Sequence, residues 1–538
     1  MRKMSPIYLS LVLVVVATVA ASGQSFQVQC PSSTITHPSA LHDNNSEPAY
    51  TTATTLAAGA NGYLVPTANV NGAIKCQQIS GGDGFATMGD GSQTYLFAFG
   101  PLSGLADMSK GQPGTQFPNV FNTVAPPLVP GDPATSDGAS QSPSYSFGNP
   151  LLFNYNGAVG LASDLDAIAS GACVPDTLGL CLDGHVDPRP IMDVGVMNGN
   201  MPAPLMAIDE DDEFFLTLTN VGQVMRPDLF EQHTVHFHGY PNASAFYDGV
   251  PDASVAINIG GSFTYYYLAP DAGTYFWHCH ITPPEHLQMG MVGQLYVRPR
   301  QNRVPSSMSL YAALQAQQLD QRTKCDSTDI LCSNPLPAVN TGATGGGKYA
   351  YNDGDGTTKY DVEYPIQIHG FDPNFHFVGM TFNPEGFTEM KDKYFLLNGR
   401  SYPDTIHDGP LATQTTDGSL HYAQPMSAII NIPVGGRALL RIADLDVTEY
   451  QTLASLGIPM QVIALNAKLL RDQAGNNLYY NTNSITLAGG ESLDVILDAS
   501  DTGKYPSGSV FYLYTPNLDH LSNDAENFGG LMTEVRIN

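Results

Sequence analysis

Residues 273–291 read GTYFWHCHITPPEHLQMGM, and this stretch decides how the rest of the chain is interpreted. Its first half follows a glycine and is rich in aromatic residues, which is typical of a β-strand. In a strand, residues two apart point to the same side. His278 and His280 therefore share one face of the strand, and Cys279 points to the other face.

A second segment supplies three more histidines. Residues 233–238 read HTVHFH, so the last two histidines also share a face of a short strand. Together the two segments predict two sites back to back. The first site would contain His236, His238, His278 and His280, and the second would contain His233, Cys279, His286 and Met291.

The second set of side chains has the donors of a type 1 copper site. One thiolate, two imidazoles and a weakly bound thioether suit copper in both of its oxidation states. Structural zinc sites rarely use methionine. Peptide bonds join Cys279 to His278 and His280, so electrons taken up at this copper can pass to the four-histidine face. Cys279, His278 and His280 are therefore the candidate catalytic residues, as the path for electron transfer.

Short alternating segments bounded by turn residues recur on both sides of these motifs. They include SFTYYYLAP at 262–270 and GQLYVRP at 293–299, and a second series contains SLDVILDAS at 492–500 and SVFYLYTPN at 509–517. This pattern predicts an all-β chain with two β-sandwiches. The second series contains no His-x-His motif, so we expect the second sandwich to be copper-free.

Composition shifts and turn-rich stretches suggest the domain boundaries. The predicted segments are a signal peptide at 1–23, an extended N-terminal arm at 24–74, a first domain at 75–300 with a long loop insertion at about 101–190 and the copper sites, a helix and linker at 301–358, and a second domain at 359–538. The helix is expected over 306–322, capped by Ser306 or Ser307.

Charge and the N-terminus restrict the partners and the location. The chain has 538 residues, only 13% are charged, and the net charge is −28, which argues against nucleic acid and anionic membranes as partners. Arg2 and Lys3 precede a short apolar run that ends near small residues, as in a secretory signal. We expect a secreted protein, extracellular or periplasmic, without a membrane span. An uncleaved anchor is the alternative.

The chain has seven cysteines, an odd number. Three disulfides suit an exported protein. The neighbouring cysteines in the sequence are Cys173 with Cys181 and Cys325 with Cys332, and Cys30 with Cys76 could form a third pair. That pairing leaves Cys279 as a thiol, although the connectivity does not follow from the sequence alone.

The two histidine segments and the strands around them resemble the multicopper oxidases and the related copper nitrite reductases. The resemblance is strong over about 185–300 and weaker over 360–538. It implies two cupredoxin-like Greek-key β-sandwich domains. In that family, paired His-x-His motifs of the first domain hold half of a trinuclear copper cluster. Carried over, the cluster ligands are His236, His238, His278 and His280, and the type 1 ligands are His233, Cys279, His286 and Met291.

The sequence departs from the family pattern in three places. The type 1 motif lies in the first domain, two additional residues separate Cys279 from His286, and the second domain lacks paired histidines. The resemblance therefore implies copper at a type 1 site and at a type 2 or type 3 site of open nuclearity. Related two-domain proteins are homotrimers, so a neighbouring subunit is one source of further ligands, with His369 and His376 as candidates.

Three functions fit these observations. The first is a laccase-like oxidase that takes single electrons from a phenol or a metal ion and passes them to dioxygen. The second is an electron-transfer or copper-binding protein with an incomplete trinuclear site. The third is an enzyme of the nitrite-reductase type, against which stands His236, where that family has an aspartate.

Overall fold

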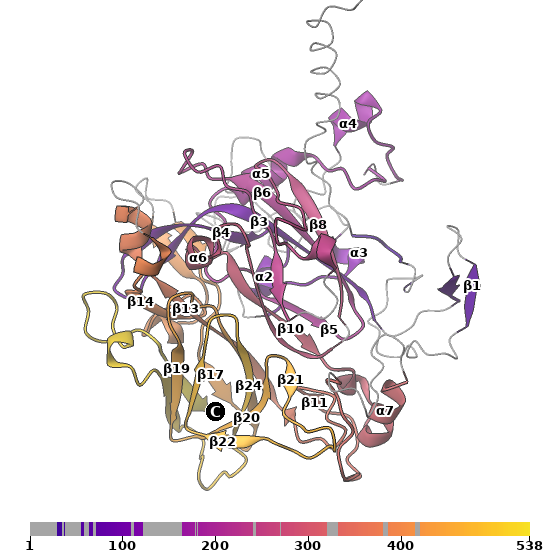
Figure 1. Cartoon of the computed structure of the whole chain (residues 1–538), viewed down its shortest axis with the longest axis vertical. Helices are drawn as coiled ribbons and strands as arrows, with labels where there is room; N and C mark the ends of the chain where they lie inside the picture. Colours follow the sequence, from indigo (N-terminus) through magenta and orange to yellow (C-terminus); the bar gives the residue numbers. More distant parts are fainter. Residues whose placement is uncertain are drawn as a thin grey trace, which may run out of the picture.

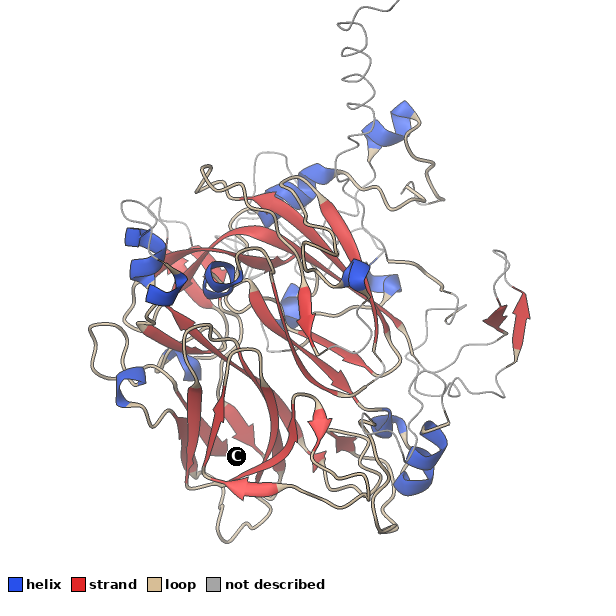
Figure 2. Cartoon of the chain, in the orientation of Figure 1, coloured by secondary structure: helices blue, strands red, loops and turns tan. Residues whose placement is uncertain are grey.

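The structure is a computed structural model. It describes residues 30–34, 37, 55–58, 64–67, 72–108, 112–121, 164–177, 179, 181–239, 244–269, 271–319, 332–379, 386–414 and 420–538. The predicted signal peptide at 1–23 lies outside the described residues, as do Cys325 and most of the predicted arm and loop insertion. Strands dominate, with short helices around them (Figure 2), which confirms the predicted all-β class.

The first half of the described chain forms two four-stranded sheets, in the upper part of Figure 1. Both sheets contribute to one buried cluster, which includes Phe97 and Leu216 from one sheet and Trp277 and Leu295 from the other. The first sheet has the order β4 (Gln93–Pro101), β3 (Ile74–Thr87), β6 (Glu213–Gly222) and β8 (Ser262–Leu268). The second has the order β5 (Met206–Asp209), β10 (Val292–Arg298), β9 (Gly273–His278) and β7 (His236–His238).

The second half of the chain forms another pair of sheets, in the lower part of Figure 1. One has the order β14 (Tyr394–Leu397), β13 (Val362–Phe371), β18 (Arg437–Asp444), β24 (Ser492–Asp498), β20 (Met460–Leu465) and β21 (Lys468–Leu469), with β22 (Tyr480–Thr482) beside β20. The other has the order β17 (Ile430–Ile432), β26 (Met532–Ile537), β25 (Val510–Tyr514), β19 (Gln451–Leu456) and β23 (Ser484–Leu487). Residues of both sheets share a second buried cluster.

The two halves have the same strand connectivity. β3 runs parallel to β6 as β13 runs parallel to β18, and β5 runs parallel to β10 as β17 runs parallel to β26. β7 pairs with β9 in the same way that β19 pairs with β25. The chain is therefore an internal repeat of one β-sandwich, and positions in one half can be matched to positions in the other.

The remaining elements are short. The helices are α2 (Leu105–Met108), α3 (Pro118–Phe121), α4 (Leu165–Ser170), α5 (Pro188–Gly195), α6 (Pro283–Gln288) and α7 (Leu310–Gln317). Single turns are η1 (Ala245–Tyr247), η2 (Arg300–Arg303), η3 (Asn374–Gly379), η4 (Phe387–Glu389), η5 (Asp404–Ile406) and η6 (Leu518–His520). Small two-stranded sheets pair β1 (Leu56–Ala58) with β2 (Leu64–Pro66), β11 (Lys348–Tyr349) with β12 (Lys359–Tyr360), and β15 (Leu411–Gln414) with β16 (Leu420–Ala423).

The helix predicted over 306–322 is shorter than expected. It is α7, and its cap is Ser309, whose hydroxyl accepts a hydrogen bond from the Ala312 amide at 3.4 Å. The segment expected to be a flexible linker is packed, because Tyr351 and Asp353 are fully buried. Glycine and threonine there form turns around the Asp353 carboxylate, whose oxygens accept hydrogen bonds from Thr358 and Gln301.

Disulfides follow the predicted pairs where both cysteines are described. Cys30 bonds to Cys76, and Cys173 bonds to Cys181. Cys332 is also disulfide-bonded. Cys279 is a buried free thiol.

The two halves pack through polar contacts beside β9. The Thr274 hydroxyl of β9 donates to the Asp494 carboxylate of β24 at 2.6 Å, and the Ser492 hydroxyl donates to the Thr274 carbonyl at 2.7 Å. The first residues of β9 are thereby held against the second half. Among the described residues, no helix is long and apolar enough to cross a membrane.

Candidate metal centre

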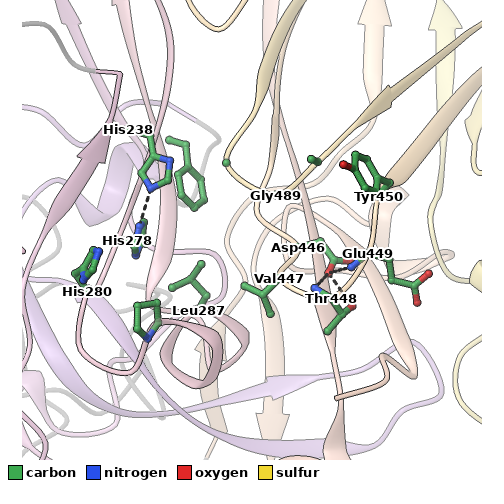
Figure 3. A pocket seen from close by; sticks show the side chains of 14 residues that line it. His238, His278, His280, Leu287, Asp446, Val447, Thr448, Glu449, Tyr450 and Gly489 are labelled. Carbon is green, nitrogen blue, oxygen red and sulfur yellow. Dashed lines mark hydrogen bonds between the residues drawn. The ribbon is translucent and has the colours of Figure 1, made fainter. Parts of the chain in front are cut away.

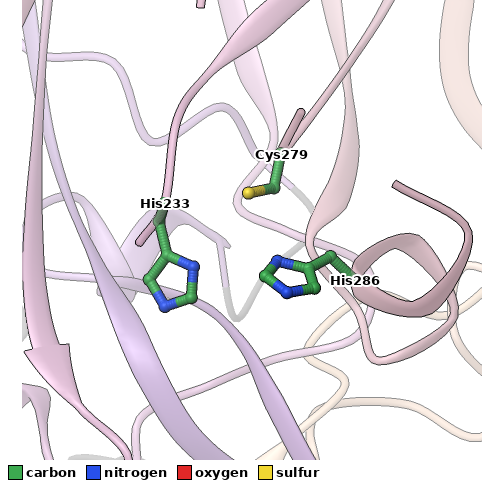
Figure 4. A group of neighbouring side chains, drawn as sticks. All are labelled: His233, Cys279 and His286. Carbon is green, nitrogen blue, oxygen red and sulfur yellow. The ribbon is translucent and has the colours of Figure 1, made fainter. Parts of the chain in front are cut away.

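Three of the predicted type 1 ligands lie together inside the first sandwich (Figure 4). His233 precedes β7, Cys279 follows β9 directly, and His286 lies in α6. One donor atom from each lies within 4.8 Å of the other two, and all three side chains are buried. The structure therefore joins three strand or helix ends into one small cluster of nitrogen and sulfur donors.

The donors of this cluster lack polar partners. Both ring nitrogens of His233 and both of His286 are buried without a hydrogen bond. Burial lowers the pKa of His233 to about 3 and holds the pKa of His286 well below its usual range. Burial also raises the pKa of the Cys279 thiol to about 11. Buried imidazoles without partners are costly, so the cluster fits a metal ion, and its sulfur and nitrogen donors fit copper.

Met291 is fully buried in the same apolar cluster as Cys279. The Cys279 amide donates to the Met291 carbonyl at 3.0 Å, and the Met291 amide donates to the His286 carbonyl at 2.9 Å. These bonds keep Met291 beside two of the donors, where its thioether could act as a further, weak ligand.

The surroundings of the cluster position its rings. A Cβ added to Gly81 of β3 would lie 2.6 Å from the His233 ring, so only glycine leaves room for this imidazole. Phe97 of β4 packs edge-on against His286, with ring centroids 5.2 Å apart. Sequence reasoning missed both residues, because neither is a ligand and both precede the ligands by more than a hundred positions.

The four-histidine face lies behind this cluster. His236, His238 and His278 each offer a nitrogen within 4.8 Å of the others, and the His280 ring lies 5.1 Å from the His236 ring. The Nε2 atoms of His238 and His278 are 2.9 Å apart. Cys279 lies on the opposite face, as the strand alternation predicts.

The outer nitrogens of two rings are held by carbonyl groups. His236 Nδ1 lies 2.6 Å from the Asp248 carbonyl, and His278 Nδ1 lies 2.6 Å from the Cys279 carbonyl. Such bonds fix the tautomer and direct Nε2 toward a shared point. The arrangement could therefore hold at least one further metal ion, and the Cys279 backbone connects it to the first cluster.

The histidines form one wall of a cavity of about 480 Å³ (Figure 3). His238, His278 and His280 lie on one side, with Leu287 of α6 below them, and Pro283 of the same helix also lines the cavity. The opposite wall is a loop of the second half, residues 446–450, together with residues 488–490. No histidine of the second half is among the described residues that line this cavity.

The internal repeat shows which residues of the second half stand at the positions of the paired histidines. In the first half, β7 and β9 pair through His236 and His278, and in the second half β19 and β25 pair through Ala454 and Tyr514. The matched positions are His236 and Ala454, His238 and Leu456, and His278 and Tyr514. The second half therefore keeps the strands but has non-ligating side chains where the first half has imidazoles.

His369 and His376 are not exposed to a neighbouring subunit. Both are buried, and they contact α6 of the same chain: His369 Nε2 lies 2.8 Å from the Leu287 carbonyl, and His376 Nε2 lies 3.0 Å from Gln288 Oε1. They hold the helix that carries His286, a role that the sequence did not reveal. The prediction that they complete a neighbour's site is wrong, because no surface exposes them.

Comparison with known proteins locates the resemblance in the segment that carries both histidine motifs. Residues 184–302 match the family model described as multicopper oxidase. This segment is similar to a multicopper oxidase domain. The predicted resemblance to multicopper oxidases is thus confirmed, and the matched segment contains all eight candidate ligands.

Curated relatives share the multicopper oxidase segment at modest identity. A laccase of Aspergillus fumigatus, abr2, is 31% identical over 139 residues, 26% of this chain and 22% of the laccase. The multicopper oxidase MmcO of Mycobacterium tuberculosis is 31% identical over 132 residues, 23% of this chain and 24% of that protein. A copper-containing nitrite reductase of Rhizobium meliloti is 34% identical over 109 residues, 19% of this chain and 26% of the reductase. The match thus covers about a quarter of each relative.

Among solved structures, the blue copper oxidase of Nitrosomonas europaea is similar, with 22% identity and a TM-score of 0.41 over 63% of this chain and 78% of that one. A copper nitrite reductase of the same organism has 16% identity and a TM-score of 0.38 over 63% of this chain and 85% of that one.

Proposed function

We propose that the protein is a secreted, copper-dependent oxidoreductase of the laccase type. It would oxidise phenols or metal ions by single electrons and pass the electrons to dioxygen. The observation that carries the proposal is the pairing of two donor clusters. The buried Cys279 thiol lies beside two imidazoles, those of His233 and His286, that have no hydrogen-bond partner. The residues before and after Cys279 are His278 and His280, which belong to the four-histidine face.

His233, Cys279, His286 and Met291 would hold a type 1 copper, which supplies one-electron transfer when bound. Cys279 would bind the metal as a thiolate, and burial lowers the pKa of His233 and of His286, which favours the neutral imidazoles that a metal ion needs. Aromatic side chains seal the cluster: Phe97 lies against His286, and Trp277 stacks on Phe99 at 5.4 Å. The short backbone path from Cys279 to His278 carries electrons to the cavity.

His236, His238, His278 and His280 would hold the copper at which dioxygen is reduced. The proposal leaves the number of coppers on this face to measurement, and a homotrimer in which another subunit adds ligands is one arrangement that it includes. The cavity of about 480 Å³ beside these rings gives dioxygen and water room to enter and leave.

Oxygen uptake with a phenolic donor tests this function. Copper-loaded protein should consume oxygen, and Cys279→Ser and His238→Ala should each abolish the uptake. His185→Ala is the matched control, because His185 lies away from both clusters, beside Asp183 at 2.8 Å. A copper-loaded sample that consumes no oxygen would exclude the oxidase.

An electron-transfer protein is the second candidate function. The non-histidine side chains at Ala454, Leu456 and Tyr514 favour it, since none of the described second-half residues that line the cavity is a histidine. Such a protein would show the visible absorption of type 1 copper and exchange electrons rapidly with a carrier, yet leave dioxygen and nitrite unreduced.

A further inference from the structure

Two carboxyl groups of the second half lie against each other behind the cavity. Asp392 precedes β14, Asp446 follows β18, and their side chains hydrogen bond to each other. A Cβ on Gly370 of β13 would lie 2.1 Å from an Asp392 oxygen and 2.8 Å from an Asp446 oxygen. The glycine thus leaves space for the pair. A carboxyl–carboxyl hydrogen bond requires a proton on one of the two groups.

The pair reaches the cavity through the loop that forms its second wall. Asp446 itself lines the cavity, as do Thr448 and Glu449. The Thr448 hydroxyl donates to Asp392 and lies 3.0 Å from Asp446 Oδ1. Asp446 and Glu449 are the carboxyl groups among the described residues that line the cavity, and the lining includes no lysine or arginine.

The other end of the pair reaches the helix that carries His286. Gln288 of α6 donates from Nε2 to Asp392 Oδ1 at 2.5 Å. Its Oε1 accepts from the Asp372 amide at 3.1 Å and lies 3.0 Å from His376 Nε2, which fixes the orientation of the amide. Asp392 therefore accepts a hydrogen bond from Gln288 of α6 on Oδ1 and one from the Thr448 hydroxyl on Oδ2.

Both carboxyl groups are buried, whereas Glu449 is partly exposed, with 44% of its side chain accessible. Burial, and next the neighbouring Asp446 carboxyl, hold the pKa of Asp392 well above its usual range. The hydrogen-bonded pair therefore holds a proton behind the cavity wall, and the partly exposed Glu449 carboxyl of the same loop connects the wall to solvent.

Other titratable groups surround the pair. Asp444 at the end of β18 receives the Asp446 amide on Oδ1 at 3.0 Å. Gln451 of β19 donates to Asp446 at 2.6 Å. The remaining titratable neighbours of the pair and its contacts are Glu449, Glu491, His369, Asp372, His376 and His520.

We propose that Asp446, supplied by Asp392, delivers protons to dioxygen in the histidine-lined cavity. The inference rests on the oxidase function proposed above. Reduction of dioxygen to water breaks the O–O bond and adds four electrons and four protons. The electrons come from the phenol or metal-ion donor through copper. The protons pass from Asp392 to Asp446 and into the cavity, and solvent returns them to the pair by way of Glu449.

The test separates electron entry from proton delivery in stopped flow. The variants are Asp446→Asn and Asp392→Asn, which keep the shape of the side chain and remove the acid. Asp444→Asn is the control, because Asp444 is a buried carboxyl of the same strand end that does not line the cavity. Copper-loaded protein is first reduced by a phenolic donor without oxygen, and then mixed with oxygen while the blue absorption returns.

We expect both variants to bleach at the wild-type rate and to regain colour at least about a hundredfold more slowly, the usual scale of a lost proton donor. The wild-type rate of recolouring should fall as pH rises, and the Asp446→Asn rate should be flat. The control should behave as wild type. Without copper, the infrared band of the protonated carboxyl should be weaker in both variants than in wild type.

Recolouring of both variants at the wild-type rate and with the wild-type pH profile would overturn the proton path, while the oxidase function would stand. Equal slowing of bleaching and recolouring would also overturn it, because that result indicates a structural defect of the loop. Wild-type protein that bleaches but never recolours in oxygen would overturn the oxidase function, and the proton path with it.

Discussion

His233, Cys279 and His286 show at the residue scale why we propose a metal site at the first cluster. Each unpaired buried donor costs about 1–3 kcal/mol of folding free energy, which a bound metal ion would offset. That these candidate ligands lie together could be predicted from the sequence, because they occur in two short segments and their residue types are characteristic. The residues that pack around the ligands could not be predicted, because side chains such as those of Gly81 and Phe97 have no chemical signature.

Replacement of Gly81 by alanine should disturb the copper site without removing a ligand. The new Cβ would lie 2.6 Å from the His233 ring, so the imidazole or the strand has to move. We expect a loss of stability of about 1–3 kcal/mol and a weaker or shifted blue absorption. Gly386→Ala is the control, because its nearest neighbour would be 3.7 Å away. Identical spectra and copper contents in the two variants would contradict the geometry.

Copper binding should tighten as pH rises. Burial raises the pKa of Cys279 to about 11, so the thiol must release its proton to bind the metal at neutral pH. At pH values below that pKa, the dissociation constant of copper should therefore fall about tenfold for each unit by which the pH is raised. Competition titrations with a chelator at several pH values measure the slope. In Cys279→Ser the slope should be lost, and an equal slope in that variant would assign the proton to another group.

At the scale of elements, α6 links the proposed copper ligand His286 to the second half. The sequence analysis predicts no helix around ITPPEH, and the structure shows one that starts at Pro283. The anchor of this helix could not be predicted, because His369 and His376 lie more than eighty residues away and their pattern is not distinctive. The strand alternation around Cys279 was predictable, since period-two patterns are local.

Gln288→Leu tests the link between α6 and the second half. The substitution removes the amide that donates to Asp392 at 2.5 Å and faces His376 at 3.0 Å, and it leaves buried polar groups without a partner. We expect a loss of about 1–3 kcal/mol and faster loss of copper from the type 1 site. Thermal unfolding and the rate of copper transfer to a chelator measure the two effects. Unchanged copper release would show that α6 needs no such anchor.

At the scale of the whole molecule, the two sandwiches are joined by buried charges beside β9. Arg441 of β18 lies 3.0 Å from Glu363 and also contacts the Thr274 hydroxyl of the first half at 3.4 Å. The two-sandwich architecture was predictable from the recurring strands. The packing of the sandwiches was not, because the cavity combines histidines of one half with a loop that has no motif in the other.

Glu363 should make the free energy of unfolding depend on pH in the acid range. Burial alone would raise the pKa of Glu363, but Arg298 and Arg441 lower it to about 2. Because this pKa lies below the ordinary value of about 4.5, the pairing of ionised Glu363 with the two arginines stabilises the fold fully above pH 4.5. That stabilisation is lost as the pH falls toward 2. Glu363→Gln should cost about 3–5 kcal/mol at neutral pH and flatten the acid limb of the stability curve. Urea unfolding across this range measures both, and an unchanged acid limb would contradict the pairing.

The central claim is that one chain holds a type 1 copper and, behind it, a second copper site that reduces dioxygen. Copper per chain, measured with the visible spectrum on the same copper-loaded sample, tests it most directly. The account predicts an intense blue absorption, as the thiolate–copper bond gives, together with at least two coppers per chain. One copper per chain with that absorption would contradict the oxidase and leave an electron carrier. Absence of the blue absorption would contradict the assignment of Cys279 itself.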